Sequence, residues 1–419
     1  MKKFTYYISL ILSLCAMNTG FSQKLQFSPD TIVIDSSNYT RYLNLSKKLL
    51  NRYQLTQAGV IAEKLYAYDT LNTDGILQCA DVYSDLNNAD KTIFYYTKAI
   101  EADTMNIYPY LKAGEFFQKN NRFVEALNTY APVVNSLDTM NYFALKQSGI
   151  CVLLLGNPML FQMALRYLDR AAAVNPYDLS LYFRIANTCN TMRDFDRSIA
   201  VCQKGLAIDS TNTVIRTAMA YAQYHKSDFK NAIENFEKVK TQGDSSSFVV
   251  KNLGYAYYRD NQFEPARKHL TRAAKMLYNE GVNEYDVYFF LGDVCVQLND
   301  PKAALSFLQK ADSLRYPSSE VQSKIYKSFA TVYNSERDWA NGAKFFEMAY
   351  NTNPEDKGSL LLWAYQCDYM KDKNKAFELY TQFLNSEESK DYPKELAIVK
   401  QRITKLKEDL FFEGKAHKK

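Results

Sequence analysis

The sequence predicts an all-α protein, built as a solenoid of about ten helix pairs and closed by a C-terminal capping helix. Apolar residues recur at spacings of three and four, which is the period of an amphipathic helix. The same apolar pattern returns after about 34 residues along most of the chain. The 419 residues include only 14 Gly and 10 Pro and are 47% hydrophobic, a composition typical of a folded, helix-rich chain.

The clearest copy of the pattern lies at residues 323–354. A first apolar stripe ends at a polar turn, residues 334–338, and a second stripe precedes Pro354. The stripes consist of Tyr326, Phe329, Ala330, Tyr333, Trp339, Gly342, Phe346 and Ala349. This copy resembles the tetratricopeptide repeat, a helix pair of roughly 34 residues with aromatic and small residues at fixed positions. The resemblance implies a right-handed α-solenoid of such pairs.

The remaining pairs are expected in order along the chain. The first, at residues 42–65, matches the pattern weakly, as terminal repeats often do. The second keeps the period, because Ala99 lies 34 residues after Leu65. In the fourth, residues 156–158 (Gly-Asn-Pro) predict a longer turn between the two helices. The ten pairs are expected at residues 42–65, 76–99, 110–133, 148–176, 182–202, 219–239, 250–273, 288–311, 323–354 and 360–383.

Two irregular segments interrupt the array. Residues 278–284 connect the seventh pair to the eighth and predict a bend between two sub-arrays. The sub-arrays are then residues 38–278, with about seven repeats, and residues 279–390, with about three. Residues 315–319 form a second irregular joint.

A single helix at residues 391–413 is expected to cover the end of the stack, because a terminal repeat exposes an apolar face. Asp391 is available as its N-cap. Its apolar stripe consists of Leu396, Val399, Ile403, Leu406 and Leu410. Binding of a membrane surface through its lysine-rich face is the alternative, and residues 414–419 are expected to be a frayed tail.

The N-terminus has the pattern of a secretory signal peptide over residues 1–22. Lys2 and Lys3 precede an apolar run that ends near Met17, and small residues follow it. A membrane anchor is an alternative, although the run is shorter than a span needs. Lipid attachment at Cys15 is another, although Leu14 stands where such sites usually carry a small residue. We therefore expect an exported protein, located in the periplasm or alternatively associated with the outer membrane or secreted, with residues 23–37 as an extended leader.

Removal of that peptide leaves six cysteines. An exported protein can form disulfides, and Cys189 and Cys202 are the pair to test because they lie on partner helices of one repeat. The competing interpretation is that the cysteines are small apolar core residues.

Charge and motifs disfavour several classes of function. The 51 basic and 46 acidic residues give a net charge of +5, which is too small to predict nucleic-acid binding. The three histidines, His225, His269 and His417, are far apart, and the common phosphate-binding, dinucleotide-binding and metal-protease motifs are missing. We expect no enzymatic activity, no cofactor and no metal site, although a catalytic dyad assembled across repeats would escape this test.

The resemblance also implies a concave groove lined by the first helix of each pair. Carried over by position, the partner-binding residues are Arg184, Asn187, Tyr221, Tyr224, Lys251, Asn252, Tyr255 and Tyr258, with Phe183, Asn190, Thr217, His225, Phe248 and Arg259 beside them. Aromatic, cationic and amide side chains suit an extended peptide, but ordinary solvated helix faces are the alternative. The carboxylate clamp of some family members is incomplete, because Phe183 replaces its Lys and Ala218 its second Asn.

The resulting hypothesis is a non-enzymatic scaffold of the cell envelope that binds a protein or peptide partner in its groove, with no membrane span after signal removal. A glycan- or cell-wall-binding module that stacks sugars on the groove tyrosines is the alternative. An enzyme, or an accessory subunit of one, is a third. Partner identity and oligomeric state are left open by the sequence.

Overall fold

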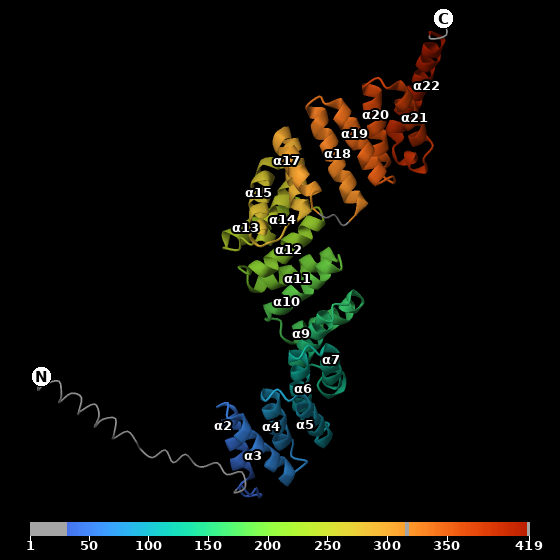
Figure 1. The fold of residues 1–419 in the computed structure, drawn as a ribbon. Coiled ribbons are helices and arrows are strands. Elements are labelled where there is room, and N and C mark those ends of the chain that lie inside the picture. Colours follow the sequence, from blue (N-terminus) through green and yellow to red (C-terminus); the bar gives the residue numbers. More distant parts are fainter. Residues whose placement is uncertain (1–31, 315–317, 417–419) are drawn as a thin grey trace, which may run out of the picture. The chain divides into compact units, whose positions relative to one another are not determined.

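The computed structural model describes residues 32–314 and 318–416, and within these ranges every regular element is a helix (Figure 1). The described helices form ten consecutive pairs followed by α22 (Pro393–Ala416), so the predicted solenoid of helix pairs with a terminal helix is confirmed. The predicted signal peptide, Cys15, most of the leader, residues 315–317 of the second joint and the last three residues of the tail lie outside the described residues.

The chain divides into two compact units, Met1–Leu181 and Tyr182–Lys419, which are described separately. The first unit contains α2 (Tyr39–Leu50), α3 (Leu55–Tyr68), α4 (Thr73–Asp85), α5 (Ala89–Ala102), α6 (Ile107–Lys119), α7 (Phe123–Pro132), η2 (Val133–Leu137), α8 (Tyr142–Leu154), η3 (Pro158–Leu160) and α9 (Phe161–Val174). The π-helical segment η2 follows Pro132, which has no N–H to donate, and was not predicted.

The second unit begins within α10 (Leu179–Thr191). It continues with α11 (Phe195–Ile208), α12 (Thr213–His225), α13 (Phe229–Thr241), α14 (Ser247–Arg259), α15 (Phe263–Asn279), α16 (Tyr285–Gln297), α17 (Pro301–Asp312), α18 (Ser319–Ser335), α19 (Trp339–Thr352), α20 (Lys357–Tyr369), α21 (Lys373–Leu384), η4 (Glu387–Asp391) and α22. The predicted division into sub-arrays at residue 278 stays a prediction; Tyr278 belongs to α15.

Each pair turns at one residue with a positive φ angle, which ends the first helix in the left-handed conformation. Asparagine, which tolerates this conformation better than most residues, occupies four of these positions and Gly156 a fifth. The ten residues are Tyr53, Asn87, Asn121, Gly156, Arg193, Ser227, Asn261, Asn299, Arg337 and Lys371. Each of these residues marks the point at which the first helix of its pair ends.

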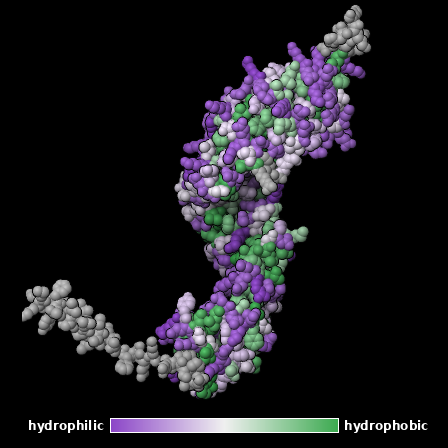
Figure 2. All heavy atoms as spheres, viewed as in Figure 1, coloured by the Kyte–Doolittle hydropathy of each residue, from purple (hydrophilic) through white to green (hydrophobic). Residues whose placement is uncertain are grey.

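The apolar stripes of successive helices form the core of each unit. On the face seen in Figure 2, hydrophilic residues are mixed with exposed apolar ones. Gly254 lies at a close approach of two helices: a Cβ built on it would be 2.7 Å from Cγ and Cδ2 of Leu270. The six cysteines after the predicted signal peptide are all buried thiols, Cys189 and Cys202 among them. Burial raises the pKa of Cys202 to about 12, as expected of a core thiol.

The terminal helix α22 packs on α21 and buries Val399 and Leu406. A two-point ion pair fixes its position, because the Arg402 guanidinium donates to both carboxylate oxygens of Asp368 at 2.6 and 2.7 Å. The expected N-cap was wrong: Asp391 belongs to η4, and the carbonyl of Tyr392 accepts the first helical hydrogen bond from Leu396.

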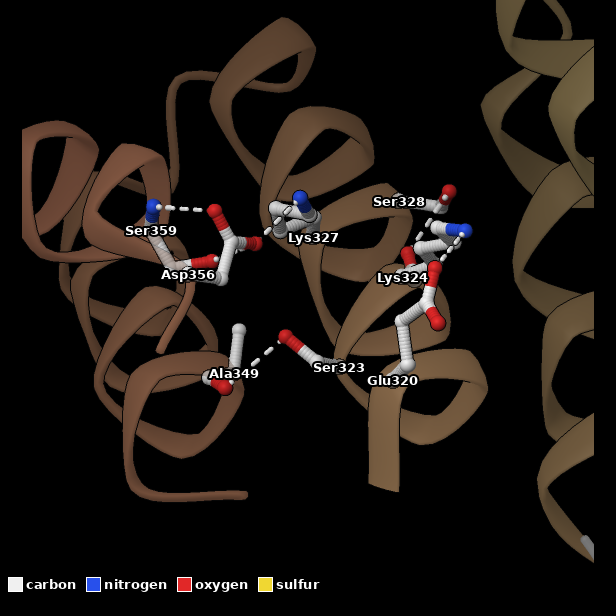
Figure 3. Close-up of polar contacts among 8 residues, drawn as sticks. All are labelled: Glu320, Ser323, Lys324, Lys327, Ser328, Ala349, Asp356 and Ser359. Carbon is white, nitrogen blue, oxygen red and sulfur yellow. Dashed lines mark hydrogen bonds and ion pairs between the residues drawn. The ribbon is translucent and has the colours of Figure 1, made fainter. Parts of the chain in front are cut away.

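Polar contacts link α18 to its partner helix α19 and to the start of the following pair (Figure 3). The Ser323 hydroxyl donates to the carbonyl of Ala349 at 2.9 Å. Lys327 Nζ lies 2.6 Å from Asp356 Oδ2, which also accepts from the Ser359 hydroxyl at 2.8 Å. Asp356 is also the N-cap of α20. The same carboxylate therefore caps one helix and forms an ion pair with the preceding repeat.

This carboxylate predicts an acid-dependent loss of stability. Burial alone would raise the pKa of Asp356, but the hydrogen bonds from Lys327 and Ser359 outweigh it and hold the pKa below its usual value. A depressed folded-state pKa stabilises the fold above the unfolded pKa of about 3.9, and the contribution disappears as the pH falls through the folded pKa. Asp356→Asn should therefore lower stability at neutral pH and flatten the dependence of stability on pH below about 4.

The measurement is urea unfolding, followed by circular dichroism, at a series of acidic pH values. Asp90→Asn is the matched control, because Asp90 is exposed in the first turn of α5. Identical pH profiles for wild type and Asp356→Asn would contradict the role of this carboxylate.

Candidate functional site

A pocket of about 620 Å³ opens between the first helices of three consecutive pairs in the second unit, α10, α12 and α14. Ala186, Ala220 and Gly254 turn into the core of these helices, so the residues on either side of that stripe face outward. The pocket is lined by Phe183, Asn187, Asn190, Thr191, Arg193, Phe195, Val214, Thr217, Ala218, Tyr221, His225, Asp244, Ser246, Phe248 and Val249.

Aromatic rings form much of the wall. Tyr221 and His225 are one turn apart on α12, with ring centroids 4.3 Å apart. Phe195 stacks on His225 at 5.2 Å and an interplanar angle of 8°. Phe248, at the start of α14, lies 6.1 Å from Tyr221 and is 46% exposed. The pocket therefore presents ring faces that a guest can cover.

Amide and hydroxyl groups supply the polar part of the lining. Asn187 is exposed, whereas Asn190 is buried and its Nδ2 donates to the carbonyl of Ala218 at 3.1 Å. The Oδ1 of Asn190 is buried without a hydrogen-bond partner among the described residues. Thr217 is satisfied within α12, since its hydroxyl donates to the Thr213 carbonyl at 2.8 Å. Asn187 is thus the amide most available to a ligand.

The charges of the lining nearly cancel. Arg193 and Asp244 contribute one charge of each sign. Burial, followed by the nearby Arg193 charge, lowers the pKa of His225, so its imidazole is neutral at neutral pH. A pocket with aromatic walls, amides and no net charge suits a neutral apolar group rather than a carboxylate or a phosphate.

Two of the eight residues predicted to bind a partner, Asn187 and Tyr221, line this pocket together. Arg184 is half-buried beside it on α10 and does not line it. Tyr224 does not line the pocket either. It packs against two neighbouring clusters of core residues, and its ring contacts those of His225 and Phe229.

Three other predicted residues are engaged in contacts within the fold. Lys251 forms an ion pair with Glu284, and Asn252 is buried with its Nδ2 donating to the Phe248 carbonyl at 2.8 Å. Tyr255 is buried too, and its hydroxyl donates to Asp286 at 2.7 Å. Sequence position alone does not distinguish Lys251 and Tyr255 from groove residues, because their partners, Glu284 and Asp286, belong to the next repeat.

Tyr258, the eighth predicted residue, lines a second pocket of about 480 Å³ formed by α14, α16 and α18. Its hydroxyl donates to Asp293, and burial raises the pKa of that carboxyl. Arg259, also at this pocket, lies over the Phe229 ring at 5.1 Å. The full lining is Tyr258, Arg259, Asn261, Phe263, Phe289, Phe290, Gln297 and Lys324.

Eight residues that line the first pocket were not predicted. Five of them lie outside the middle of the first helices: Arg193, Phe195, Val214, Asp244 and Ser246. The others are Thr191, Ala218 and Val249. Arg193 is the left-handed turn residue of its pair, and Phe195 begins the second helix. The aromatic residue directly after a helix-pair turn is a signal that could have identified Phe195. No group of three or more His, Cys, Asp or Glu side chains in the described parts of the chain could hold a metal ion. Likewise, none of the described helices is both long and apolar enough to span a bilayer.

Comparison with known proteins gives matches to tetratricopeptide repeats. Residues 76–104, 179–212 and 285–316 match the model of the tetratricopeptide repeat. A TPR repeat-containing protein of Methanocaldococcus jannaschii is 24% identical over 142 residues, which are 33% of this chain and 24% of the relative. The match thus spans about a quarter of that relative's length.

Two solved structures show similar helical arrangements. The C-terminal part of a TPR repeat-containing protein from Cytophaga hutchinsonii has a TM-score of 0.46 and 17% identity, covering 59% of this chain and 97% of its own. YrrB, a TPR protein with an unusual peptide-binding site, has a TM-score of 0.40 and 19% identity, covering 46% and 95% respectively. Because both scores lie below 0.5, neither similarity bears on function.

Proposed function

This chain is a tetratricopeptide-repeat protein, and from that premise we propose that it is a non-enzymatic scaffold whose pocket between α10, α12 and α14 holds a peptide segment of a protein partner. Repeats of this kind bury their apolar faces in one another and leave the faces of the first helices available for partners. The pocket is the feature that carries the proposal.

The chemistry of the pocket supports a peptide with a large apolar side chain. Phe248, Tyr221 and His225 provide ring faces for such a side chain, and large aromatic contacts commonly dominate the energy of peptide recognition. Asn187 provides an exposed amide beside the rings that can bond the peptide backbone. A neutral lining with one Arg and one Asp gives no site for a charged terminus.

We propose further that the protein works outside the cytoplasm, in the periplasm or attached to the outer membrane. The proposal is supported by the charged, apolar and small-residue segments of residues 1–22. Amino-terminal sequencing of protein recovered from cell fractions tests it, and an intact Met1 on cytoplasmic protein would reject it.

A glycan or cell-wall ligand is the second candidate, because Phe248 is partly exposed and nearly parallel to Tyr221, at an interplanar angle of 27°. Such a ring can stack on a sugar face. Sedimentation with isolated cell wall separates the candidates: a protein scaffold stays in the supernatant, whereas a glycan-binding module pellets.

The test of the scaffold combines Tyr221→Ala with Phe248→Ala. Crosslinking in intact cells and mass spectrometry identify the partner, and titration calorimetry then measures its affinity for purified wild type and variant. Loss of two central aromatic contacts should weaken binding by about tenfold or more. Tyr278→Ala is the matched control, since Tyr278 is an exposed tyrosine outside the pocket. Equal affinity of the double variant and the wild type for the partner would show that the partner does not bind in this pocket.

A further inference from the structure

Four turns of the first unit present large apolar residues to solvent at equivalent places. The turns connect one helix pair to the next and have the sequences D-T-L-N at 69–72, D-T-M-N at 103–106 and 138–141, and N-P-Y-D at 175–178. Their third residues are Leu71, Met105, Met140 and Tyr177, with exposures of 73, 75, 56 and 78%. We call these four residues the tip row.

The backbone of each tip residue is bonded within its own turn. The side-chain oxygen of the first turn residue accepts a hydrogen bond from the backbone N–H of the tip, at 3.1 Å for Asp69 and Leu71 and 3.2 Å for Asn175 and Tyr177. The same bond is 3.1 Å from Met105 to Asp103 and 3.3 Å from Met140 to Asp138. In the first three turns the fourth residue is an Asn that caps the next helix. These bonds restrain the backbone of each turn, and all four tip side chains are exposed.

The turn itself does not require an apolar tip. In the second unit, residues 209–212 form the same turn, with the Thr211 N–H bonded to Asp209 at 2.9 Å and Asn212 capping α12. Its tip is the exposed, polar Thr211, and the turn at 353–356 carries the exposed Glu355. Where the second unit has the same turn, at 209–212 and 353–356, the tip is therefore polar, whereas all four such turns of the first unit carry an exposed apolar tip.

The stacking of the helix pairs brings the tips into a row. The turns lie at the same end of consecutive pairs, and the first helices that follow the first three turns contact one another in order, α4 with α6 and α6 with α8. The fourth turn lies against α8, because Tyr142 and Lys146 of that helix both donate to Asp178. Packed helices lie about 8–10 Å apart, so neighbouring tips are separated by roughly 10 Å. An α-helix rises about 10 Å in seven residues, so apolar residues at heptad spacing on a helix match this separation.

The charge of the tip row indicates which residues a partner helix carries beside its apolar ones. The four turns contain four Asp and no Lys or Arg. Asp178 is paired with Lys146, which leaves Asp69, Asp103 and Asp138 as acidic groups beside the first three tips. The Arg170 guanidinium reaches the third turn, where it donates to the Thr139 carbonyl at 2.7 Å. An acidic row disfavours an anionic lipid surface and favours basic flanking residues on the partner.

We propose that the tip row is a second interaction surface, distinct from the pocket of the second unit, that binds an amphipathic helix of a partner protein with apolar residues at heptad spacing and Lys or Arg beside them. The surface is sequence-tolerant, because it consists of four separate apolar contacts and a diffuse acidic charge instead of a shaped pocket.

The test is a selection from a phage-displayed library of helical segments, with the full chain as bait. The comparison bait carries Leu71→Thr, Met105→Thr, Met140→Thr and Tyr177→Thr, which copy the tip that the chain itself has at Thr211. Clones enriched on the wild type should carry apolar residues at heptad spacing with basic neighbours, and should bind the fourfold variant about tenfold or more weakly. Unchanged circular dichroism shows that the variant is folded.

Thr211→Met is the matched control, since it adds one apolar tip in the second unit and should leave binding unchanged. Clones that bind both baits equally, or that lack the apolar and basic pattern, overturn the proposal. Flotation of the wild type with phosphatidylcholine vesicles would assign the tip row to lipid binding. Self-association that is lost in the fourfold variant would assign it to contact with a second copy of the chain. Either result also overturns the proposal. Binding of the selected helices should survive Tyr221→Ala with Phe248→Ala, so failure of this proposal and failure of the scaffold proposal are distinguishable.

Discussion

Gly254→Leu should lower the free energy of unfolding by roughly 1–3 kcal/mol, because the site has no room for a side chain. A Cβ at this position would lie 2.7 Å from two side-chain carbons of Leu270 and 3.1 Å from its backbone nitrogen. The backbone contact matters most, since α15 would have to move away from α14 to relieve it. Denaturant unfolding followed by far-UV circular dichroism measures the loss as a lower midpoint.

Gly59→Ala is the control for this prediction. A Cβ at Gly59 meets only Cγ1 of Val82, at 3.4 Å, an ordinary van der Waals contact. Alanine also favours the helix over glycine, so this change should leave stability equal or slightly higher. A Gly254→Leu protein that unfolds at the wild-type midpoint would contradict the close approach of α14 and α15.

Phe236→Ala should have a larger effect, with a loss of about 3–5 kcal/mol. The Phe236 ring is fully buried on α13, among Ala220, Val249 and Leu253. Its removal leaves a cavity beneath the helices that carry Tyr221 and Phe248, and the neighbouring side chains can refill it only in part. Thermal and denaturant unfolding both measure the loss.

Phe248→Ala separates stability from binding at the same place. Phe248 lines the pocket and is 46% exposed. Its removal should therefore change the free energy of unfolding by about 0.5 kcal/mol or less, while it weakens binding of the partner. Equal losses of stability in the two alanine variants would show that Phe248 is a core residue and would count against the pocket as a binding site.

The candidate site shows where inference from sequence stopped. Asn187 and Tyr221 were found because their places in the repeat predict an outward direction. Tyr255 occupies the same repeat position as Tyr221, yet its hydroxyl is bonded to Asp286 of the next pair. Phe195 and Asp244 come from turns and second-helix starts, whose distance from α12 depends on how neighbouring pairs stack. A repeat signature specifies the direction of a residue and not the partner that it meets.

Local chemistry within the sequence determined the helix pairs of this protein. Amphipathic periodicity, the turn residues between paired helices and the Asn and Asp caps act over a few residues, so their effects can be read from the chain. Only the tertiary structure decided which outward side chains are engaged in contacts, as with Lys251 and Glu284, and which remain open, as with Phe248. The reason is physical: the environment of a solenoid residue is set by side chains about one repeat away, through packing and ion pairs that local sequence does not encode.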